Sequence, residues 1–153
     1  MNVTSKGRYA LRVMLDLAQH REDGFISLKT VADRQEISQK YLEAIISSLK
    51  KAELVESSRG KEGGYRIAKD PADCTAGEIL RCIEDNLAPV PCVREAAANC
   101  DRAGACLTLP MWMELDAISN RYLDSVSLTD LLTGERWRSG DAPLEIGTKE
   151  IQQ

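Results

Sequence analysis

The spacing of apolar residues predicts three amphipathic helices in the first fifty residues of the chain. Thr4 and Ser5 can cap the first helix, which is expected to end at Asp23-Gly24. Two shorter helices are predicted after caps at Ser27 and Ser38, with a tight turn at residues 35–37 between them. The apolar stripe of the third helix, which should face a core, consists of Leu42, Ile45, Ile46 and Leu49.

The third predicted helix also carries a row of polar side chains opposite its apolar stripe. These residues follow one another at intervals of three or four, so they line up on the solvent side of the helix. Two short helices joined by a turn, the second with an exposed polar row, are typical of a helix-turn-helix. The row consists of Lys40, Glu43, Ser47 and Lys50.

A short hairpin is predicted directly after the third helix. Residues 54–57 and 65–67 have the composition of strands, and the segment 58–64 between them holds three glycines together with Arg59 and Lys61. Such a segment is too flexible and too charged to belong to a core. Helix, turn, helix and basic hairpin together predict a winged helix.

The second half of the chain predicts further helices around an irregular segment. Thr75 and Glu78 form the pattern of a capping box that opens a fourth helix, whereas residues 86–106 show no periodicity. Pro110 lies in the first turn of a long helix, and Ser127 can cap a last short helix that Gly134 ends. The apolar stripe of the long helix consists of Met111, Leu115, Ile118, Tyr122 and Val126.

These elements predict a mainly α fold with a small β wing, arranged in four consecutive parts. A winged helix-turn-helix DNA-binding domain is expected at residues 1–85, and a cysteine-bearing loop at residues 86–106. Helices at residues 107–133 are expected to form a homodimer, because their apolar stripe is left over and helix-turn-helix regulators bind symmetric half-sites as dimers. The polar tail, residues 134–153, is expected to be flexible.

The candidate DNA-binding residues lie in the third helix and at the wing. A recognition helix presents side chains from its first turns to base edges, while a wing reaches the backbone or the minor groove. Lys40 can hold phosphate or guanine, Gln39 can pair with adenine, and Glu43 can accept from cytosine. A solvated helix surface and a protein-interaction module are the competing interpretations. The candidates for contact with double-stranded DNA are Ser38, Gln39, Lys40, Tyr41, Glu43, Ser47, Lys50, Arg59 and Gly60.

Charge is distributed unevenly along the chain, although its net value is −4. Residues 1–70 carry 13 Lys and Arg against 10 Asp and Glu, whereas residues 71–153 carry 7 against 14. The basic half therefore coincides with the predicted DNA-binding domain. No apolar run approaches the roughly 20 residues of a membrane span, and the first residues lack the apolar centre of a signal peptide. We expect a cytoplasmic protein with no membrane partner.

The sequence also argues against an enzyme. It contains no nucleophile elbow of the form G-x-S-x-G, no phosphate-binding loop, and no pair of carboxylates in a glycine-rich setting. Its only histidine, His20, lies at the polar end of a predicted helix and is expected on the surface. A single histidine also excludes any site that needs two.

Five cysteines in a chain without an export signal favour metal or redox chemistry over structural disulfides. Cys92, Cys100 and Cys106 lie in the irregular segment, with seven and then five residues between them. Zinc sites favour closer cysteine pairs, whereas wide intervals suit the larger iron–sulfur clusters that thiolates bind. Three ordinary loop cysteines are the competing interpretation. Cys82 lies beside apolar residues of the fourth helix and is expected in the core.

Several motifs of the chain resemble the Rrf2 family of winged-helix transcriptional regulators. They are Thr4-Ser5-Lys6-Gly7-Arg8-Tyr9-Ala10, Ile37-Ser38 with Tyr41-Leu42-Glu43, and Leu54-Val55 followed by Arg59-Gly60 and Gly63-Gly64-Tyr65. The resemblance runs from residue 1 to about residue 132. It implies a homodimer with crossed long helices, and DNA contacts from residues 38–43 and 59–60. It also implies an iron–sulfur cluster, 2Fe-2S or 4Fe-4S, on the three cysteines between residues 92 and 106.

The chain departs from the cluster-binding members of this family in three respects. Those members generally leave five residues in the first cysteine interval, and this chain leaves seven. Some use a histidine just after the third cysteine, where this chain has Leu109, and others use a carboxylate near the N-terminus of the partner chain, where this chain has Arg8. Neither fourth ligand therefore carries over to this chain, which leaves a carboxylate such as Asp101 or Glu95, a carboxylate of the partner chain, or an exogenous thiol or water for that position.

The leading prediction is a dimeric, sequence-specific transcriptional regulator whose DNA affinity is controlled by an iron–sulfur cluster that senses iron, redox state or nitric oxide. One alternative is a cluster-free regulator controlled by disulfide formation among the three loop cysteines. Another is a cluster-free regulator that binds an enzyme of sulfur metabolism. Anaerobically purified cluster protein should be brown, whereas the alternatives predict a colourless protein.

Overall fold

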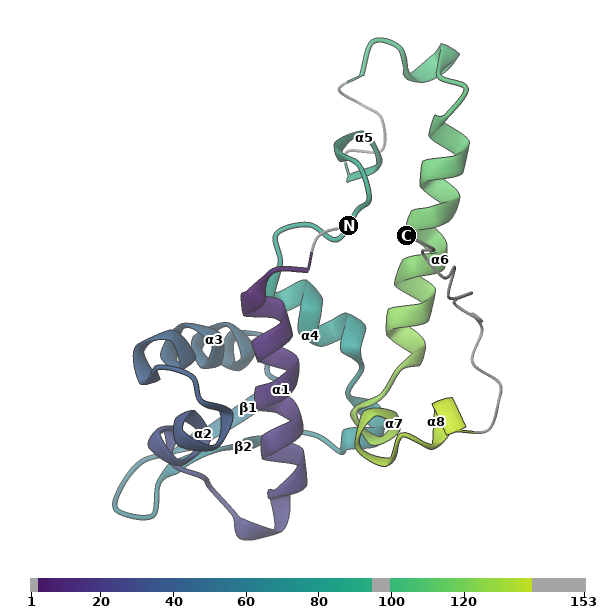
Figure 1. Ribbon diagram of the computed structural model, residues 1–153. Helices are drawn as coiled ribbons and strands as arrows, with labels where there is room; N and C mark the ends of the chain where they lie inside the picture. The colour runs from purple at the N-terminus through teal and green to yellow at the C-terminus, as the bar shows by residue number, and fades with distance from the viewer. Residues whose placement is uncertain (1–2, 95–99, 139–153) are drawn as a thin grey trace, which may run out of the picture.

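The structure is a computed structural model that describes residues 3–94 and 100–138 of the 153-residue chain (Figure 1). Its helices are α1 (Ser5–Gln19), α2 (Leu28–Gln35), α3 (Gln39–Lys51), α4 (Ala76–Ile83), α5 (Pro91–Arg94), α6 (Leu109–Ser125), α7 (Leu128–Thr133) and α8 (Glu135–Arg138). Strands β1 (Val55–Ser58) and β2 (Gly64–Ile67) lie between α3 and α4 along the chain. The predicted mainly α fold with a small β wing is confirmed.

Polar side chains start five of these helices at the positions that the sequence predicts. Thr4, Ser27, Ser38, Thr75 and Ser127 each accept a hydrogen bond from a backbone N–H in the first turn of the helix that follows. At Thr75 and Ser127 a carboxylate three residues later bonds back to the cap, which completes a capping box. The local hydrogen-bonding pattern therefore sets where each helix begins.

Apolar side chains from α1 to α4, from both strands and from α7 meet in one core. The predicted stripe of α3 lies inside it, since Leu42, Ile45, Ile46 and Leu49 are at most 3% exposed. Cys74 is fully buried in the same core, and the partly buried Cys82 packs against it as predicted. Burial of these mostly aliphatic side chains is what holds the helix-turn-helix on α1 and α4.

The wing is an antiparallel pair of strands that is also attached to the segment before α2. Val55 pairs with Ile67 and Ser58 with Gly64, and Ile26 and Tyr65 exchange two backbone hydrogen bonds of 2.9 and 2.8 Å. Gly64 has a φ of 157°, and a Cβ at this position would collide with the Ile26 carbonyl. Glycine is therefore required where the wing approaches the start of α2.

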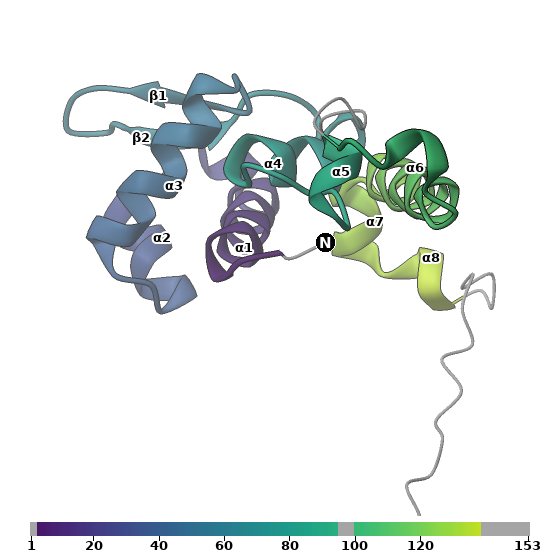
Figure 2. The ribbon, with the colours of Figure 1, turned by 90° about the horizontal axis from the view of Figure 1, so that it is seen from above.

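Helix α4 lies between the winged-helix part and α6. From above, α3 and the wing are on one side of α1 and α4, and α6 is on the other side (Figure 2). The segment that carries α5 and residues 100–106 lies at the end of α6 far from α7 (Figure 1). Within the described residues, no helix combines the length and the apolar character needed to cross a membrane.

The structure differs from the sequence-based expectations in three places. Helix α1 ends at Gln19 and a 3₁₀ turn covers Arg21–Asp23, because the polar residues after Gln19 offer no apolar contact to the core. Helix α5 occupies part of the segment expected to be irregular, since Pro91 suits the first position of a helix. Helix α8 occupies the start of the expected tail. The rest of the expected tail, residues 139–153, lies outside the described residues.

Candidate functional site

The polar face of α3 is open to solvent along its length. Lys40, Glu43, Ser47 and Lys50 are all exposed, as are Ser38 and Gln39 at the start of the helix. Tyr41 is half-buried, and its ring meets the Tyr9 ring edge-on at a centroid distance of 5.8 Å. The predicted contact residues of α3 therefore form one accessible surface, with Tyr41 also supporting the helix.

A buried carboxylate holds α2 on α1 and so positions the helix-turn-helix. Asp16 is the one buried charged residue among the described part of the chain, with 2% exposure. Its carboxylate accepts hydrogen bonds from Arg34 Nε at 3.0 Å, Arg34 Nη2 at 2.6 Å and Gln35 Nε2 at 2.9 Å. A buried carboxylate needs such partners to offset the loss of water. Asp16 thus ties α1 to the end of α2, directly before the turn into α3.

Sequence reasoning missed Asp16 as a structural residue. Its place three residues after Val13 and directly before Leu17, on the apolar stripe of α1, is the signal that could have identified it. Its partners lie 18 and 19 residues further along the chain, so the spacing within α1 alone does not reveal them.

The wing is joined to α3 by a direct contact. Lys50 Nζ donates a hydrogen bond of 2.6 Å to Ser57 Oγ on β1. Across the hairpin, Arg66 Nε and Glu56 Oε1 form an ion pair at 2.5 Å, and the Arg66 guanidinium lies 4.5 Å from the centroid of the Phe25 ring. These contacts give the short hairpin a defined position beside the recognition-helix candidate.

Arg59 and Gly60 are exposed at the turn between the two strands. Gly60 has a φ of 108°, a conformation that glycine adopts without strain. Arg59 therefore extends from the tip of the wing, at a distance from α3 along the hairpin. The structure thus brings Lys50 to the junction between helix and wing, and leaves Arg59 at the free end.

The three loop cysteines lie in two separate described pieces of the chain. Cys92 belongs to α5, while Cys100 and Cys106 follow the segment 95–99, which lies outside the described residues. Cys100 is exposed and the other two are partly exposed. Among the residues that the structure describes, no three His, Cys, Asp or Glu side chains are gathered closely enough to hold a metal ion. A set of three preassembled ligands is therefore not present in this part of the chain.

The chemistry of these side chains nevertheless suits iron–sulfur binding, because accessible thiolates are the ligands of such clusters. Cys106 lies three residues before α6, with its sulfur 3.4 Å from Thr108 Oγ1. Hydrogen bonds from the Thr108 side chain and from the backbone of Thr108 and Leu109, together with the charge of Arg102, lower the pKa of the Cys106 thiol. Burial has the opposite effect on the core cysteines and raises the pKa of Cys74 to about 11. The donor set fits a cluster, while its geometry requires the two pieces to approach.

The predicted stripe of α6 is an exposed apolar face. Met111, Leu115, Ile118 and Tyr122 are 52%, 43%, 48% and 39% exposed. Val126, predicted to continue the stripe, follows the end of α6 and is buried instead, with 3% exposure. A row of large apolar side chains in solvent is typical of an interaction surface.

The sequence and the fold both match one family of regulators. The Rrf2 family, described as iron-dependent transcriptional regulators, matches residues 3–134 of the chain. The chain belongs to the Rrf2 family. The helix-turn-helix-type transcriptional regulator IscR of Photobacterium profundum is 38% identical over 132 residues, which cover 86% of this chain and 76% of that protein.

Two solved structures extend the match from sequence to fold. T. potens IscR is 36% identical and superimposes with a TM-score of 0.67 over 90% of both chains. CymR of B. subtilis, named as the global cysteine regulator, is 34% identical and superimposes with a TM-score of 0.71 over 88% of this chain and 98% of its own. The predicted Rrf2 membership is therefore confirmed, and with it the role of transcriptional regulator, which implies DNA binding. Regulators of this kind are generally not enzymes.

Proposed function

We propose that this Rrf2 protein is a homodimeric, sequence-specific DNA-binding regulator whose affinity for DNA is controlled by an iron–sulfur cluster. The observation that carries the DNA-binding part is the exposed polar face of α3 beside a wing that Lys50 and Ser57 join to it. A recognition helix and a wing held in one arrangement can contact a groove and the neighbouring backbone together.

The proposed contacts follow the chemistry of each side chain. Lys40 binds phosphate or guanine, Gln39 pairs with adenine, and Glu43 accepts from the amino group of cytosine. Arg59, at the tip of the wing, enters the minor groove. Lys50 contributes less than Lys40 to phosphate binding, because its ammonium group is shared with Ser57.

A second copy of the chain is the proposed partner of α6. The exposed face of Met111, Leu115, Ile118 and Tyr122 would be covered in a C2 dimer, in which the same surface is used twice. Such a dimer presents two copies of α3 to two half-sites of one operator. A dimer formed through the helices of residues 107–133 would explain why the single chain leaves this apolar face exposed to water.

Cys92, Cys100 and Cys106 are the proposed cluster ligands. A bound cluster supplies iron that responds to oxygen, nitric oxide or iron supply, which is the chemistry a sensor needs. The three cysteines would hold it, which requires α5 and residues 100–106 to approach each other. The exposure of Cys100 supports the proposal. Cys74 is buried and Cys82 packs against the core, so these two are less suited to hold a cluster.

A cluster-free regulator is the second candidate function. All five cysteines are free in the structure, and accessible thiols in the segment 92–106 can form a disulfide on oxidation. An enzyme of sulfur metabolism as a partner is the remaining alternative. Both alternatives predict that the purified protein is colourless and contains no bound iron.

Anaerobic purification followed by absorption spectroscopy and by iron and sulfide analysis tests the proposal. Cys92→Ala, Cys100→Ala and Cys106→Ala should each lose the cluster spectrum, because each removes a thiolate ligand. Cys82→Ala is the matched control and should keep it, since Cys82 packs against the core. Full iron and sulfide content in all three loop variants after anaerobic reconstitution would leave the cluster-free candidates as the explanation.

A further inference from the structure

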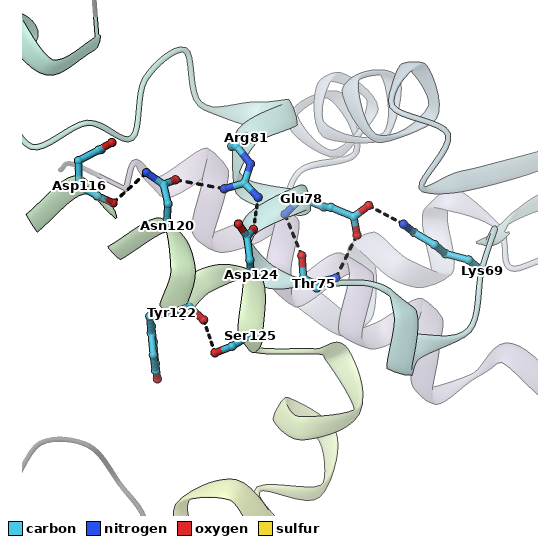
Figure 3. A network of polar contacts seen from close by, with 9 residues as sticks. All are labelled: Lys69, Thr75, Glu78, Arg81, Asp116, Asn120, Tyr122, Asp124 and Ser125. Carbon is cyan, nitrogen blue, oxygen red and sulfur yellow. Dashed lines mark hydrogen bonds and ion pairs between the residues drawn. The ribbon is translucent and has the colours of Figure 1, made fainter. Parts of the chain in front are cut away.

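An arginine of α4 connects this helix to α6 at the centre of the molecule. Arg81 Nη1 donates a hydrogen bond of 3.2 Å to Asn120 Oδ1, and Arg81 Nη2 bonds to Asp124 Oδ1 (Figure 3). Asn120 is oriented for this contact, because its Nδ2 donates to the Asp116 carbonyl at 3.0 Å. One guanidinium thereby holds two successive turns of α6.

The two helices approach closely at this contact. A Cβ on Gly77 of α4 would collide with the Asp124 carboxylate and would lie 2.7 Å from Arg81 Nη2. Glycine therefore makes room for the Asp124 carboxylate one turn before Arg81. At the start of α4 the backbone itself is tied to the end of α6 and the start of α7. The Ala76 N–H donates to the Val126 carbonyl at 2.8 Å, and the Leu128 N–H to the Cys74 carbonyl at 2.9 Å.

These backbone bonds and the Arg81 contact act at different points along α4. The backbone bonds hold the C-terminal end of α6 beside the start of α4. No residue of α6 is fully buried, so apolar packing within the chain restrains its direction only in part. The Arg81 contact with Asn120 and Asp124 lies further along α4 and gives the two helices a second point of attachment.

The other side of α4 belongs to the DNA-binding part. Ile79 and Leu80 are buried, and α4 packs against both α1 and α3. Its N-terminal capping box also receives Lys69, which follows β2, through a bond of 2.6 Å to Glu78 (Figure 3). The direction of α6 relative to α4 is therefore also its direction relative to α3 and the wing.

We propose that Arg81, by binding Asn120 and Asp124, sets the spacing of DNA half-sites that the dimer accepts. This inference rests on the proposed function, in which two chains join through α6. The distance between the two copies of α3 then depends on the angle between α6 and α4 in each chain. Arg81 touches no DNA and acts as a positioning residue through α4 and α6.

The test uses an operator selected by the wild-type protein from random DNA, with its half-sites moved apart or together by one base pair. Arg81→Gln and Asp124→Asn should both lower the preference for the best spacing over the shifted ones by about three- to tenfold, since each dimer loses two exposed ion pairs. Their opposite changes in net charge separate this effect from electrostatics, which would strengthen DNA binding in one variant and weaken it in the other.

Two further variants complete the experiment. Arg21→Gln breaks an exposed ion pair with Asp70 of 3.1 Å away from α4 and α6, and it should leave the spacing preference unchanged. Arg81→Asp combined with Asp124→Arg should restore part of the preference that Arg81→Asp alone removes. A wild-type spacing profile in Arg81→Gln or in Asp124→Asn would overturn the inference, as would opposite changes of affinity without a change of profile.

Hydrogen exchange of the DNA-free protein separates this inference from the proposed function. Amides of residues 109–125 should exchange about threefold faster in Arg81→Gln and Asp124→Asn than in the wild type, because their helix is less restrained. Unchanged exchange would count against the contact as a restraint. A wild-type protein that is monomeric, or that ignores half-site spacing, would instead contradict the proposed dimeric function.

Discussion

The winged-helix part and α6 are held in contrasting ways. The four apolar stripe residues of α3 are at most 3% exposed, whereas the stripe residues of α6 from Met111 to Tyr122 are 39% to 52% exposed. The winged-helix part thus completes its core within one chain. The apolar face of α6 is exposed in the single chain, and polar contacts from Arg81 join the helix to α4. Under the proposed function, this division separates the part that would contact DNA from the part that would bind a second chain.

The largest expected effect comes from the exposed face of α6. Leu115→Glu together with Ile118→Glu should convert dimers into monomers and abolish operator binding, because buried carboxylates at a dimer interface lack partners. Light scattering and DNA binding measure the two outcomes. Both residues are about half exposed in the single chain, so the winged-helix core should remain folded.

Ala117→Glu is the matched control for this double variant. Ala117 is exposed on the same helix but lies off the stripe of Met111, Leu115, Ile118 and Tyr122. A new carboxylate there should leave the dimer intact. A stable dimer in the double variant would show that α6 is not the interface.

The next effect concerns the buried core of the winged-helix part. Asp16→Ala should lower the free energy of unfolding by about 3 kcal/mol, because it leaves Arg34 and Gln35 without their shared acceptor. Urea unfolding measures the change. Asp33→Ala removes a carboxylate from an exposed pair with Lys29 and should cost less than about 1 kcal/mol. Equal losses in the two variants would mean that Asp16 is not a central contact.

Local patterns predicted the elements whose causes are also local. A capping side chain and the first apolar turn lie within a few residues of each other, so the starts of α1, α2, α3, α4 and α7 were predicted correctly. The stripe of α3 was predicted for the same reason, since helical periodicity alone decides which face is apolar.

Contacts between distant segments could not be predicted in this way. Arg81 and Asp124 are 43 residues apart, and Asp16 meets partners on a different helix. Helix α5 has only four residues, which is too few for a period to show. The contact roles of α3, the wing and the three loop cysteines remain predictions, because they depend on DNA, metal and partner chains.

A smaller effect is expected in the alkylation rates of the cysteines, which should differ between Cys106 before α6 and the cysteines at the winged-helix core. In reduced, cluster-free protein, alkylation should reach Cys106 at lower pH than Cys82, on the order of tenfold faster at neutral pH, because hydrogen bonds lower the pKa of Cys106 and burial raises that of Cys82. Cys74, buried and with a pKa of about 11, should react only after unfolding. Mass spectrometry of the labelled peptides measures each rate.

Thr108→Val is the control for Cys106. It removes the Oγ1 that lies 3.4 Å from the sulfur and is the largest cause of the lowered pKa. Cys106 should then reach the same alkylation rate only at a higher pH, while the alkylation rates of Cys82 and Cys74 stay unchanged. Equal alkylation rates at Cys106 and Cys82 in the folded wild type would contradict the expected difference between an accessible thiol before α6 and a thiol packed against the winged-helix core.

The smallest expected effect lies on the exposed polar face of α3, which carries opposite charges at Lys40 and Glu43. Lys40→Ala should weaken binding to every DNA sequence, and the slope of log K against log salt should fall by about 0.9 for each phosphate that is no longer neutralised. Glu43→Ala should instead relax the preference for the operator, while affinity for unrelated DNA stays similar or rises, because a negative charge near phosphate disappears. Titrations of operator and scrambled DNA at several salt concentrations measure both. If Glu43→Ala weakened binding to both DNAs by the same factor, Glu43 would support the helix rather than read a base.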